Sequence, residues 1–423
     1  MIILIVLFVA ALALGVPVAF SMAVATIGGF IALDIPLETI AQKMLAGIEP
    51  FPFVAIPLFI LAGGLMETGG ISRRLVAFAT ALVGHIRGGL GVVVVVSELL
   101  FSGISGSSVA DASAIGSILI PSLVRAGYPP ERAAAIVAAA SGMGILIPPC
   151  LVMVILGAMS GLSISALFMA GFLPGILMAL TLIIVIHIQA RRGTLPGTHG
   201  KFVWSRLRVS IKEAVLPLGM PVVLFGGILG GVTTATEAAV LAILYALVLD
   251  LFVYREMKRK DIQRIIIQTG ITTGAVSMLA GIATAMSWVF ATLAVPQAIA
   301  GIFTQITSSP FLLLAMVAIA LIIFSSILDG LPALIIFFPI FSATVAKVGV
   351  DPLHFGLLSV AAVGIGLVLP PVGLLLVVVC QIGGVTLSAA TRPMIPYIAI
   401  LVATLLAIAY VPWVVLILPR LLL

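Results

Sequence analysis

Long, uninterrupted apolar segments follow one another along the chain and are separated by short polar stretches. Residues 1–14, 214–230 and 312–328 are examples, and none of these segments contains a charged residue. Such segments are typical of membrane-spanning helices, which need about 20 apolar residues. The strands of a membrane β-barrel would instead be about ten residues of alternating polarity. The pattern therefore predicts an all-α polytopic membrane protein.

Composition and charge support this prediction. Of the 423 residues, 63% are hydrophobic and only 8% are charged, too few charges to cover the surface of a soluble protein of this size. The net charge of +6 fits the excess of Lys and Arg on cytoplasmic loops, so we expect no nucleic-acid partner. Cys150 and Cys380 lie in apolar runs and predict neither a disulfide nor a metal site. Residues 1–16 lack the positive charge of a signal peptide, and we interpret them as a mature helix.

The chain contains two copies of one pattern, 222 residues apart. In each copy a Gly and a Pro precede an apolar segment with the motif Gly-x-Gly-x-x-x-Pro-Pro, and a further Pro follows. The seven identical pairs are Gly127/Gly349, Pro130/Pro352, Gly142/Gly364, Gly144/Gly366, Pro148/Pro370, Pro149/Pro371 and Pro174/Pro396. Chance would supply one or two such pairs in a Gly-rich chain, so the chain is predicted to consist of two copies of one structural repeat.

The charges predict that the two halves are inverted. Two basic segments, 191–212 and 255–264, are expected in the cytoplasm, whereas segment 34–49 has three acids and one lysine and is expected outside. Segments 34–49 and 255–264 follow the opening helix pairs of the two halves, so the halves have opposite topology, as in many secondary transporters. With both termini outside, the predicted spans are about 1–13, 15–33, 50–67, 133–158, 163–190, 214–231, 234–254, 266–292, 355–381 and 394–418.

Two pairs of shorter apolar pieces do not fit as full spans. The first pair flanks the Ser/Gly-rich segment 102–108, and the second pair flanks Asp329 and Gly330. We predict two re-entrant helical hairpins, the first entering from the cytoplasm and the second from outside. Each hairpin precedes a helix that the Pro-Pro pair breaks, which frees carbonyl groups around 144–147 and 366–369.

These features predict a division into a framework and a moving, site-bearing part. Such movement exposes a site alternately without unwinding a helix in lipid. The predicted parts are 1–87 (framework helices of the first half), 88–160 (first hairpin and broken helix), 161–309 (framework with the central basic loop), 310–384 (second hairpin and broken helix) and 385–423 (C-terminal helix).

The polar groups at membrane depth gather at the hairpin tips and the helix breaks. Hydroxyl and carbonyl oxygens are hard ligands of the kind Na⁺ prefers, and the free N–H groups of the helix after the first tip suit a carboxylate. Related by inversion, the tips and breaks are expected to meet near the midplane and to bind an anion and its coupling cations. The predicted site residues are Ser105, Gly106, Ser107, Ser108, Gly142, Gly144, Pro148, Ser326, Asp329, Gly330, Gly364, Gly366 and Pro370. The Na⁺ ligands predicted among them are Ser105, Ser107, Asp329 and Gly366, and we expect no catalytic residue and no organic cofactor.

Each of these residues also has a purely structural interpretation. Gly and Ser permit close helix packing in membranes. Asp329 is expected either in the cation site or in holding the second tip, whereas Glu98 and Asp111 are compatible with facing a water-filled cavity. Glu237, which follows a Thr-rich segment, is interpreted as a first-turn acid that caps a helix.

Several motifs occur in the order found in one family of membrane transporters. They are Gly-Ile-Ser-Gly-Ser-Ser-Val-Ala-Asp at 103–111, Gly-Ile-Leu-Ile-Pro-Pro at 144–149, Thr-Glu-Ala-Ala at 236–239, Val-Tyr-Arg-Glu at 253–256, Asp-Pro-Leu-His-Phe-Gly at 351–356 and Pro-Pro-Val-Gly at 370–373. From about residue 12 to its end, the chain resembles DctM, the large membrane subunit of TRAP transporters. Many members have Asn-x-Glu before the second break. This chain has Ala362-Val-Gly364 there, so no polar role is carried over.

The resemblance implies a Na⁺-coupled importer of an organic acid anion in a bacterial or archaeal cytoplasmic membrane, with the fold of an elevator-type transporter. It also implies two partners, a small four-helix membrane subunit and a periplasmic substrate-binding protein. Since nothing precedes Met1, the small subunit is expected to be a separate chain. The family's substrates include C4-dicarboxylates, 2-oxoacids, sugar acids and sialic acids, and selectivity among them is expected to lie largely in the binding protein.

Two other functions remain as alternatives to this carrier. Residues 103–106 resemble the nucleophile loop of intramembrane serine proteases, with His187 the only histidine well inside an apolar run. His187 is expected about one turn from the inner interface and Ser105 near mid-depth, so we expect no enzyme. A stand-alone carrier or channel also accommodates broken helices, but the chain has no ring of acids or repeated filter.

Overall fold

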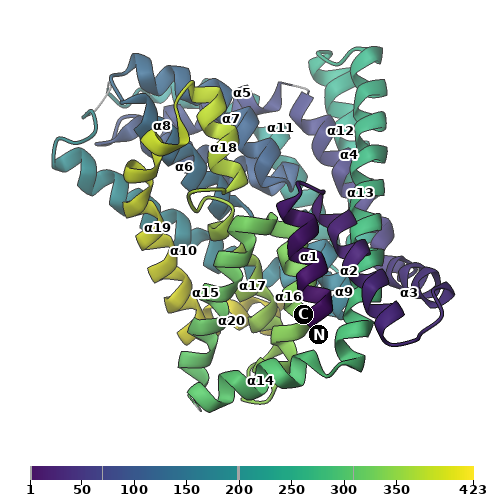
Figure 1. The fold of residues 1–423 in the computed structure, drawn as a ribbon. Helices are drawn as coiled ribbons and strands as arrows, with labels where there is room; N and C mark the ends of the chain where they lie inside the picture. Colours follow the sequence, from purple (N-terminus) through teal and green to yellow (C-terminus); the bar gives the residue numbers. More distant parts are fainter. Residues whose placement is uncertain (1, 69, 198–200, 308) are drawn as a thin grey trace.

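The computed structural model describes residues 2–68, 70–197, 201–307 and 309–423, and the regular structure assigned within these ranges is helical throughout (Figure 1). Seven of the described helices are long and apolar enough to cross a membrane, or eight if one bent pair is counted as a single span. The predicted all-α membrane fold is therefore confirmed. Residues 198–200 of the first basic segment lie outside the described ranges.

The first half contains ten α-helices and a short 3₁₀-helix among its described residues. They are α1 (Ile2–Ala13), α2 (Val18–Ala32), α3 (Glu38–Ile48), η1 (Phe51–Val54), α4 (Ala55–Thr68), α5 (Ile71–Val83), α6 (Gly89–Ser105), α7 (Ser108–Arg125), α8 (Pro130–Gly144), α9 (Leu151–Ser160) and α10 (Ile164–Arg191). The second half contains α11 (Trp204–Leu229), α12 (Ala235–Val248), the π-helix η2 (Leu249–Tyr254), α13 (Arg259–Thr292), α14 (Val295–Ile306), α15 (Pro310–Leu328), α16 (Gly330–Ala346), α17 (Pro352–Gly366), α18 (Leu374–Gly383), α19 (Leu387–Tyr410) and α20 (Pro412–Leu422).

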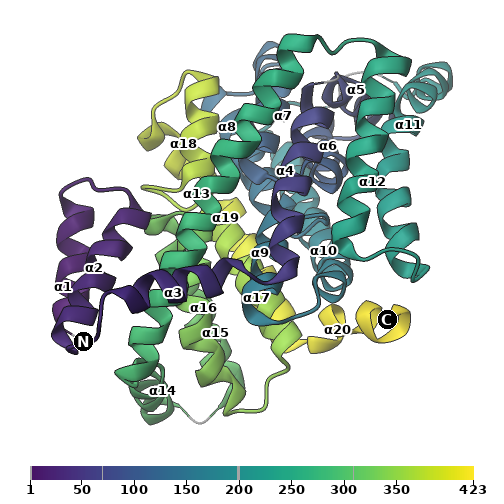
Figure 2. The same cartoon turned by 90° about the vertical axis from the view of Figure 1, so that its right-hand side faces the viewer.

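The helices repeat as the sequence predicts. Helices α6 to α10 recur in order as α15 to α19, and the first residues of the five pairs (89 and 310, 108 and 330, 130 and 352, 151 and 374, 164 and 387) differ by 221 to 223. The pair α6–α7 lies in the upper half of the molecule and α15–α16 in the lower half, both in Figure 1 and in the view turned by 90° (Figure 2). The two halves are thus inverted copies, each with a helical hairpin followed by a broken helix.

Prolines break the third helix of each repeat at the predicted positions. Helix α8 ends at Gly144, before the cis Pro148–Pro149 pair, and α17 ends at Gly366, before the cis Pro370–Pro371 pair. The carbonyls of these two glycines are not left free. Each accepts a hydrogen bond from the N–H three residues on, at 2.9 Å for Gly144 and 3.0 Å for Gly366, which tightens the last turn.

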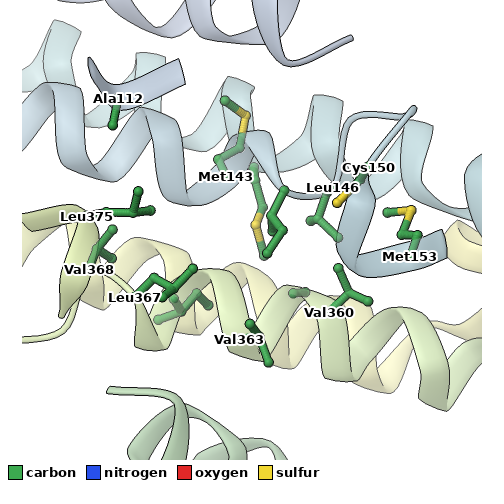
Figure 3. Close-up of a cluster of buried hydrophobic side chains, with 14 of the residues drawn as sticks. Ala112, Met143, Leu146, Cys150, Met153, Val360, Val363, Leu367, Val368 and Leu375 are labelled. Atoms are coloured by element: carbon green, nitrogen blue, oxygen red, sulfur yellow. The ribbon is translucent and has the colours of Figure 1, made fainter. Parts of the chain in front are cut away.

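The two broken helices pack against each other in the core. Figure 3 shows Met143 and Leu146 of the first half facing Val363 and Leu367 of the second half across this interface. All four side chains are at most 5% exposed. The matching breaks of the two halves therefore meet at one apolar seam.

Three short helices were not predicted, because each is amphipathic and too short to span a membrane. Helix α5 lies between α11 and α6, α14 packs on α16, and α3 packs along α13. Helices α3 and α4 are bent by 71° relative to each other, whereas their counterpart α13 is one continuous helix of 34 residues. The inverted repeat is therefore broken at this element.

Other predicted boundaries are corrected by the structure. Helices α11 and α13 begin at Trp204 and Arg259, so much of each predicted basic loop is helical. The predicted span 394–418 is wrong as one helix, because Pro412, which lacks an N–H group, starts the separate helix α20. Glu237 does cap α12, since it exchanges hydrogen bonds of 2.7 Å and 3.3 Å with Thr234.

Candidate functional site

The tip of the first hairpin is held by hydrogen bonds from backbone N–H groups to serine hydroxyl oxygens. Helix α6 ends at Ser105, and the C-cap residue Gly106 has a φ of 71°, in the left-handed region that favours glycine. The backbone N–H of Ser107 donates to Ser105 Oγ at 3.2 Å, and Ser107 Oγ accepts from the N–H of Ala110 at 3.5 Å. Ser107 is therefore the N-cap of α7, and the tip presents the start of that helix.

Asp111 lies beneath this tip and is 1% exposed. Its two carboxylate oxygens accept hydrogen bonds from different hydroxyl groups, one from Ser102 at 2.6 Å and the other from Ser105. Glu98, on α6 of the same hairpin, is fully buried and accepts from Ser141 Oγ at 2.5 Å. The alternative interpretation, in which these two acids face a water-filled cavity, does not agree with their burial, because the hairpin and α8 enclose both.

The first tip is joined to the break of its own half. The N–H of Leu151, at the start of α9, donates to the carbonyl of Gly106 at 3.1 Å. At the end of α8, Gly144 has no space for a side chain because Ser102 lies against it. The buried Pro148 lies in the same break, while Ser108 is the first residue of α7.

The second tip is built around Asp329. This residue has a φ of 73°, and its Oδ1 accepts a hydrogen bond of 2.6 Å from the N–H of Gly330, the first residue of α16. The hydroxyl of Ser326 donates to the carbonyl of Ile323 at 2.8 Å. The interpretation of Asp329 as the residue that holds the tip agrees with these contacts, and its role in a cation site stays a prediction.

The second tip also packs on the break of its own half. A side chain at Gly366 would come within 2.5 Å of Ser325 Cβ and 2.6 Å of the carbonyl of Ile322. A side chain at Gly330 would come within 2.7 Å of Val363. Gly144 and Gly366, which are 222 residues apart, therefore have the same role. Because neither has a side chain, the hairpin of the same half packs closely against each break.

The matched glycines Gly142 and Gly364 join the two halves. A side chain at Gly142 would come within 2.9 Å of the carbonyl of Gly364, and one at Gly364 would press on the carbonyl of Gly142. Both helix breaks are thus brought together, and each carries its hairpin tip with it. The predicted convergence of these four elements agrees with this geometry, and Pro370 lies half-buried in the second break.

A cavity of about 800 Å³ opens between the first tip and two helices outside the hairpin, α4 and α13. Of the thirteen predicted site residues, three line it: Ser105, Gly106 and Ser107. The other ten stand at the tips, breaks and interfaces described above. The cavity lies where the hairpin tip faces α4. The carbonyl of Ser105 packs against Gly63 of that helix, where a side chain would leave no space for it.

The residues on the opposite side of the cavity are not among the predicted site residues. Helix α13 contributes Arg264, Gln268, Thr269 and Thr272, and α4 contributes Glu67. The sequence pattern places 266–292 in an apolar framework, where no polar site residue is expected. The available signal was the four-residue spacing of Gln268 and Thr272, which places both on one face of a helix that is otherwise largely apolar.

The serine-protease alternative does not fit the structure. Ser105 Oγ donates to Asp111, while His187 Nδ1 lies 3.3 Å from the backbone carbonyl of Arg87. Ser105 thus has a carboxylate partner, and His187 lies near the end of α10, next to the loop that precedes α6. No nucleophile–base pair is formed by these two residues.

Comparisons with known proteins agree on one family. The family model described as "Tripartite ATP-independent periplasmic transporter, DctM component" matches residues 5–414. The C4-dicarboxylate TRAP transporter large permease protein DctM of Pseudomonas aeruginosa is 39% identical over 91% of this chain and 90% of its own length. The sialic acid TRAP transporter large permease protein SiaM of Vibrio cholerae is 36% identical over 96% of this chain and 95% of its own length.

A solved structure shares the fold at low sequence identity. The YdaH transporter of Alcanivorax borkumensis, described as having an unusual topology, superimposes with a TM-score of 0.64 at 16% identity. The match covers 89% of this chain and 88% of that chain. The architecture of inverted halves with hairpins and broken helices is therefore that of a known transporter fold.

Proposed function

The chain belongs to the DctM family of TRAP transporter large permease subunits, and from this premise we propose that it imports a small organic acid anion together with Na⁺. It is a membrane subunit of a secondary transporter and not an enzyme. The relatives' names include different substrates, C4-dicarboxylate and sialic acid, both of which carry a carboxylate. The proposal therefore names the chemical class and leaves the individual acid open.

The cavity at the first tip supports this proposal more than any other observation. Its volume of about 800 Å³ is within the range of small-molecule sites. The start of α7 supplies backbone N–H groups and the positive end of a helix dipole, which stabilise a carboxylate. The hydroxyl and amide groups of Thr269, Thr272 and Gln268 lie across the cavity and suit the hydroxyl groups of a sugar acid or oxoacid.

The oxygen groups beneath the tip support a role for Na⁺. Ser102, Ser105 and Asp111 place two hydroxyls and a carboxylate together in the buried end of the hairpin. A buried carboxylate is costly at membrane depth unless a cation or hydrogen bonds compensate for it. Of the Na⁺ ligands proposed from the sequence, Ser105 belongs to this cluster and Ser107 adjoins it. Asp329 and Gly366 belong to the equivalent tip and break of the second half.

Two partners complete the proposed system. A small membrane subunit is proposed to pack on the framework, and a periplasmic binding protein is proposed to deliver the anion. The outward faces of α1 and α2 carry exposed apolar side chains, including Ile5, Val9, Ile27 and Ile31, each at least 41% exposed. Such apolar faces can pack equally well against lipid or against a helix of another membrane subunit.

The proposed movement carries the hairpins and broken helices as one body against α4, α12 and α13. Helices α10 and α19 pack against α8 and α17, and so against the site-bearing elements. We therefore propose that both move with the site, although the sequence pattern places 161–309 with the framework. The cavity lies at the boundary of the two bodies, where movement would change its exposure.

Transport by the reconstituted complex tests the proposal. The full chain is placed in proteoliposomes with its small subunit, and binding protein loaded with radiolabelled acids is added outside. We expect uptake with external Na⁺ and loss of uptake when choline replaces it. The variant Ser105→Ala should raise the Na⁺ concentration for half-maximal uptake by about tenfold, because about 1.4 kcal/mol of binding is lost. The matched control Ser117→Ala removes an exposed hydroxyl of α7 and should leave that concentration unchanged.

Two outcomes would contradict the proposal. Full uptake in sodium-free buffer, driven by a proton gradient alone, would exclude Na⁺ coupling. Robust uptake of free substrate by this chain without the small subunit and the binding protein would exclude the dependence on partners.

A further inference from the structure

A second polar cavity, of about 610 Å³, lies away from the hairpin tips. It is formed by the start of α8, the end of α10 and the first three turns of α19. Three arginines, Arg132, Arg192 and Arg392, line it, together with a single acid, Glu131. Each arginine comes from a different part of the chain, so only the tertiary structure brings them together.

The arginines of this cavity have an unbalanced charge. Within the described residues, the ion pairs involve Arg73, Arg74 and Arg264, and none of the three cavity arginines is among them. Three guanidinium groups with one nearby carboxylate leave an excess of two positive charges. Planar guanidinium groups match the oxygens of a phosphate, to which they donate paired hydrogen bonds.

Hydrogen bonds hold two walls of the cavity in place. Arg132 Nη1 donates to the carbonyl of Thr194 at 2.6 Å, which ties α8 to the segment after α10. Tyr397, 1% exposed, donates from its hydroxyl to Gln189 Oε1 at 2.9 Å, which ties α19 to α10. The cavity is therefore built by cross-links between helices and not by a single flexible loop.

The surface next to the cavity is apolar and faces outward. Ile184 and Ile188 of α10 are 54% and 42% exposed, and Ile395 of α19 is 58% exposed. Ile188 and Ile395 each directly precede a residue that lines the cavity. A basic cavity above exposed apolar side chains matches a lipid, with its phosphate among the arginines and its acyl chains along α10 and α19.

The internal repeat shows that the cluster is specific to one side of the protein. The positions 222 residues away from Arg132, Arg192 and Arg392 are His354, Val414 and Ala170. His354 is buried, and its Nε2 lies 3.1 Å from the carbonyl of Ile408. The arginines are therefore no part of the repeated transport design. They lie at the end of the molecule that carries the basic segment 191–212, which charge asymmetry assigns to the cytoplasm.

We propose that this cavity binds the headgroup of an anionic phospholipid of the cytoplasmic leaflet. That leaflet is rich in anionic lipids, and each basic residue near its surface contributes about 1 kcal/mol of attraction. Because α8 and α19 belong to the proposed moving body, the lipid would accompany that body at the membrane surface. This inference does not depend on Na⁺ coupling or on the transported acid.

Lipid titration of the purified full chain tests the inference. Delipidated protein is titrated with dioleoyl phosphatidylglycerol, and bound lipid is counted by native mass spectrometry. The variant Arg132→Gln/Arg192→Gln/Arg392→Gln should weaken the tightest binding event by more than about tenfold. The control Arg255→Gln/Arg259→Gln/Lys260→Gln removes the same charge from exposed positions just before and at the start of α13, and it should change this binding by less than about twofold.

Further arms of the titration distinguish a lipid from a free phosphate group and from general surface attraction. Phosphatidylcholine should not occupy the site, and millimolar inorganic phosphate should not displace phosphatidylglycerol. Complete displacement by inorganic phosphate would overturn the lipid proposal in favour of a free phosphate group. Equal losses in the two triple variants would overturn it in favour of general surface attraction. If the triple variant does not fold, the single variant Arg392→Gln, at an exposed position, must still weaken binding, and unchanged binding would refute the site.

Discussion

At the scale of single residues, the glycines determine how closely the parts of the site approach. Gly142 and Gly364 occupy matched positions in the repeat, and each lies against the carbonyl of the other. Two residues further along, Gly144 packs against Ser102 and Gly366 packs against Ser325, each of the hairpin in the same half. A single Cβ at these positions would separate elements that the site needs together.

The variant Gly364→Ala tests this packing. Its Cβ would meet the backbone carbonyl of Gly142 and come within 2.6 Å of Ile145, so the two broken helices would have to move apart. We expect a loss of about 1–3 kcal/mol of stability, because overpacking a tight interface has about this cost. The measurement is the thermal unfolding midpoint of the purified protein in detergent.

The matched control for this variant is Gly226→Ala in α11. Nothing lies within 4 Å of a Cβ at Gly226, and alanine is favoured over glycine inside a helix by about 1 kcal/mol. We therefore expect the midpoint to stay or to rise. If Gly364→Ala were as stable as Gly226→Ala, the contact between the two breaks would not be tight.

At the scale of helices, a ring contact between α10 and α11 is one of the places where the proposed moving body meets the framework. Phe172 of α10 and Phe225 of α11 form an edge-to-face pair with ring centroids 4.8 Å apart. Helix α10 otherwise packs on the C-terminal helix α20 and on α6, α8, α9, α17 and α19. If α10 moves with the site, this aromatic contact must slide during transport.

A reversible crosslink tests the boundary. In the double variant Phe172→Cys/Phe225→Cys, a short bifunctional thiol reagent should abolish uptake, and reduction should restore it. The control Phe324→Cys/Phe337→Cys joins α15 to α16 within one hairpin, at a stacked pair with centroids 3.8 Å apart, and should leave uptake intact. Normal transport with α10 fixed to α11 would instead return α10 to the framework, as the sequence alone suggests.

At the scale of the whole molecule, the two basic segments lie at the same end. Tyr254, which directly precedes the second segment, donates from its hydroxyl to the carbonyl of Glu213, which directly follows the first segment, at 3.2 Å. The marked N and C termini lie in the lower half of both Figure 1 and Figure 2, away from the junction of α12 and α13. This arrangement agrees with basic segments inside and termini outside.

Accessibility of introduced cysteines tests the orientation. Pro36→Cys and Lys258→Cys are exposed positions on opposite sides of the predicted topology. A membrane-impermeant thiol reagent added to spheroplasts should label Pro36→Cys and leave Lys258→Cys unlabelled until the membrane is permeabilised. Labelling of both positions from the periplasmic side would contradict the positive-inside assignment on which the inverted topology was predicted.

The sequence by itself determined the class of protein, the repeat, the hairpins and the breaks. The length of an apolar segment is a local property of the sequence, and Gly and Pro affect the backbone at their own positions. Both signals can therefore be recognised without knowing which distant segments pack together. The same local chemistry predicted the cap formed by Glu237. The short amphipathic helices α3, α5 and α14 were not predicted because their length does not satisfy the criterion for a span.

Only the tertiary structure decided which side chains share a site. The far wall of the cavity comes from α13, more than 150 residues from the first tip, and Gln268 and Thr272 look like ordinary polar positions until the hairpin faces them. Asp111 is enclosed because Ser102 and Ser105 fold back over it. Arg132, Arg192 and Arg392 converge because three helix ends meet. Such contacts depend on the packing of distant segments, which a pattern along the chain does not contain.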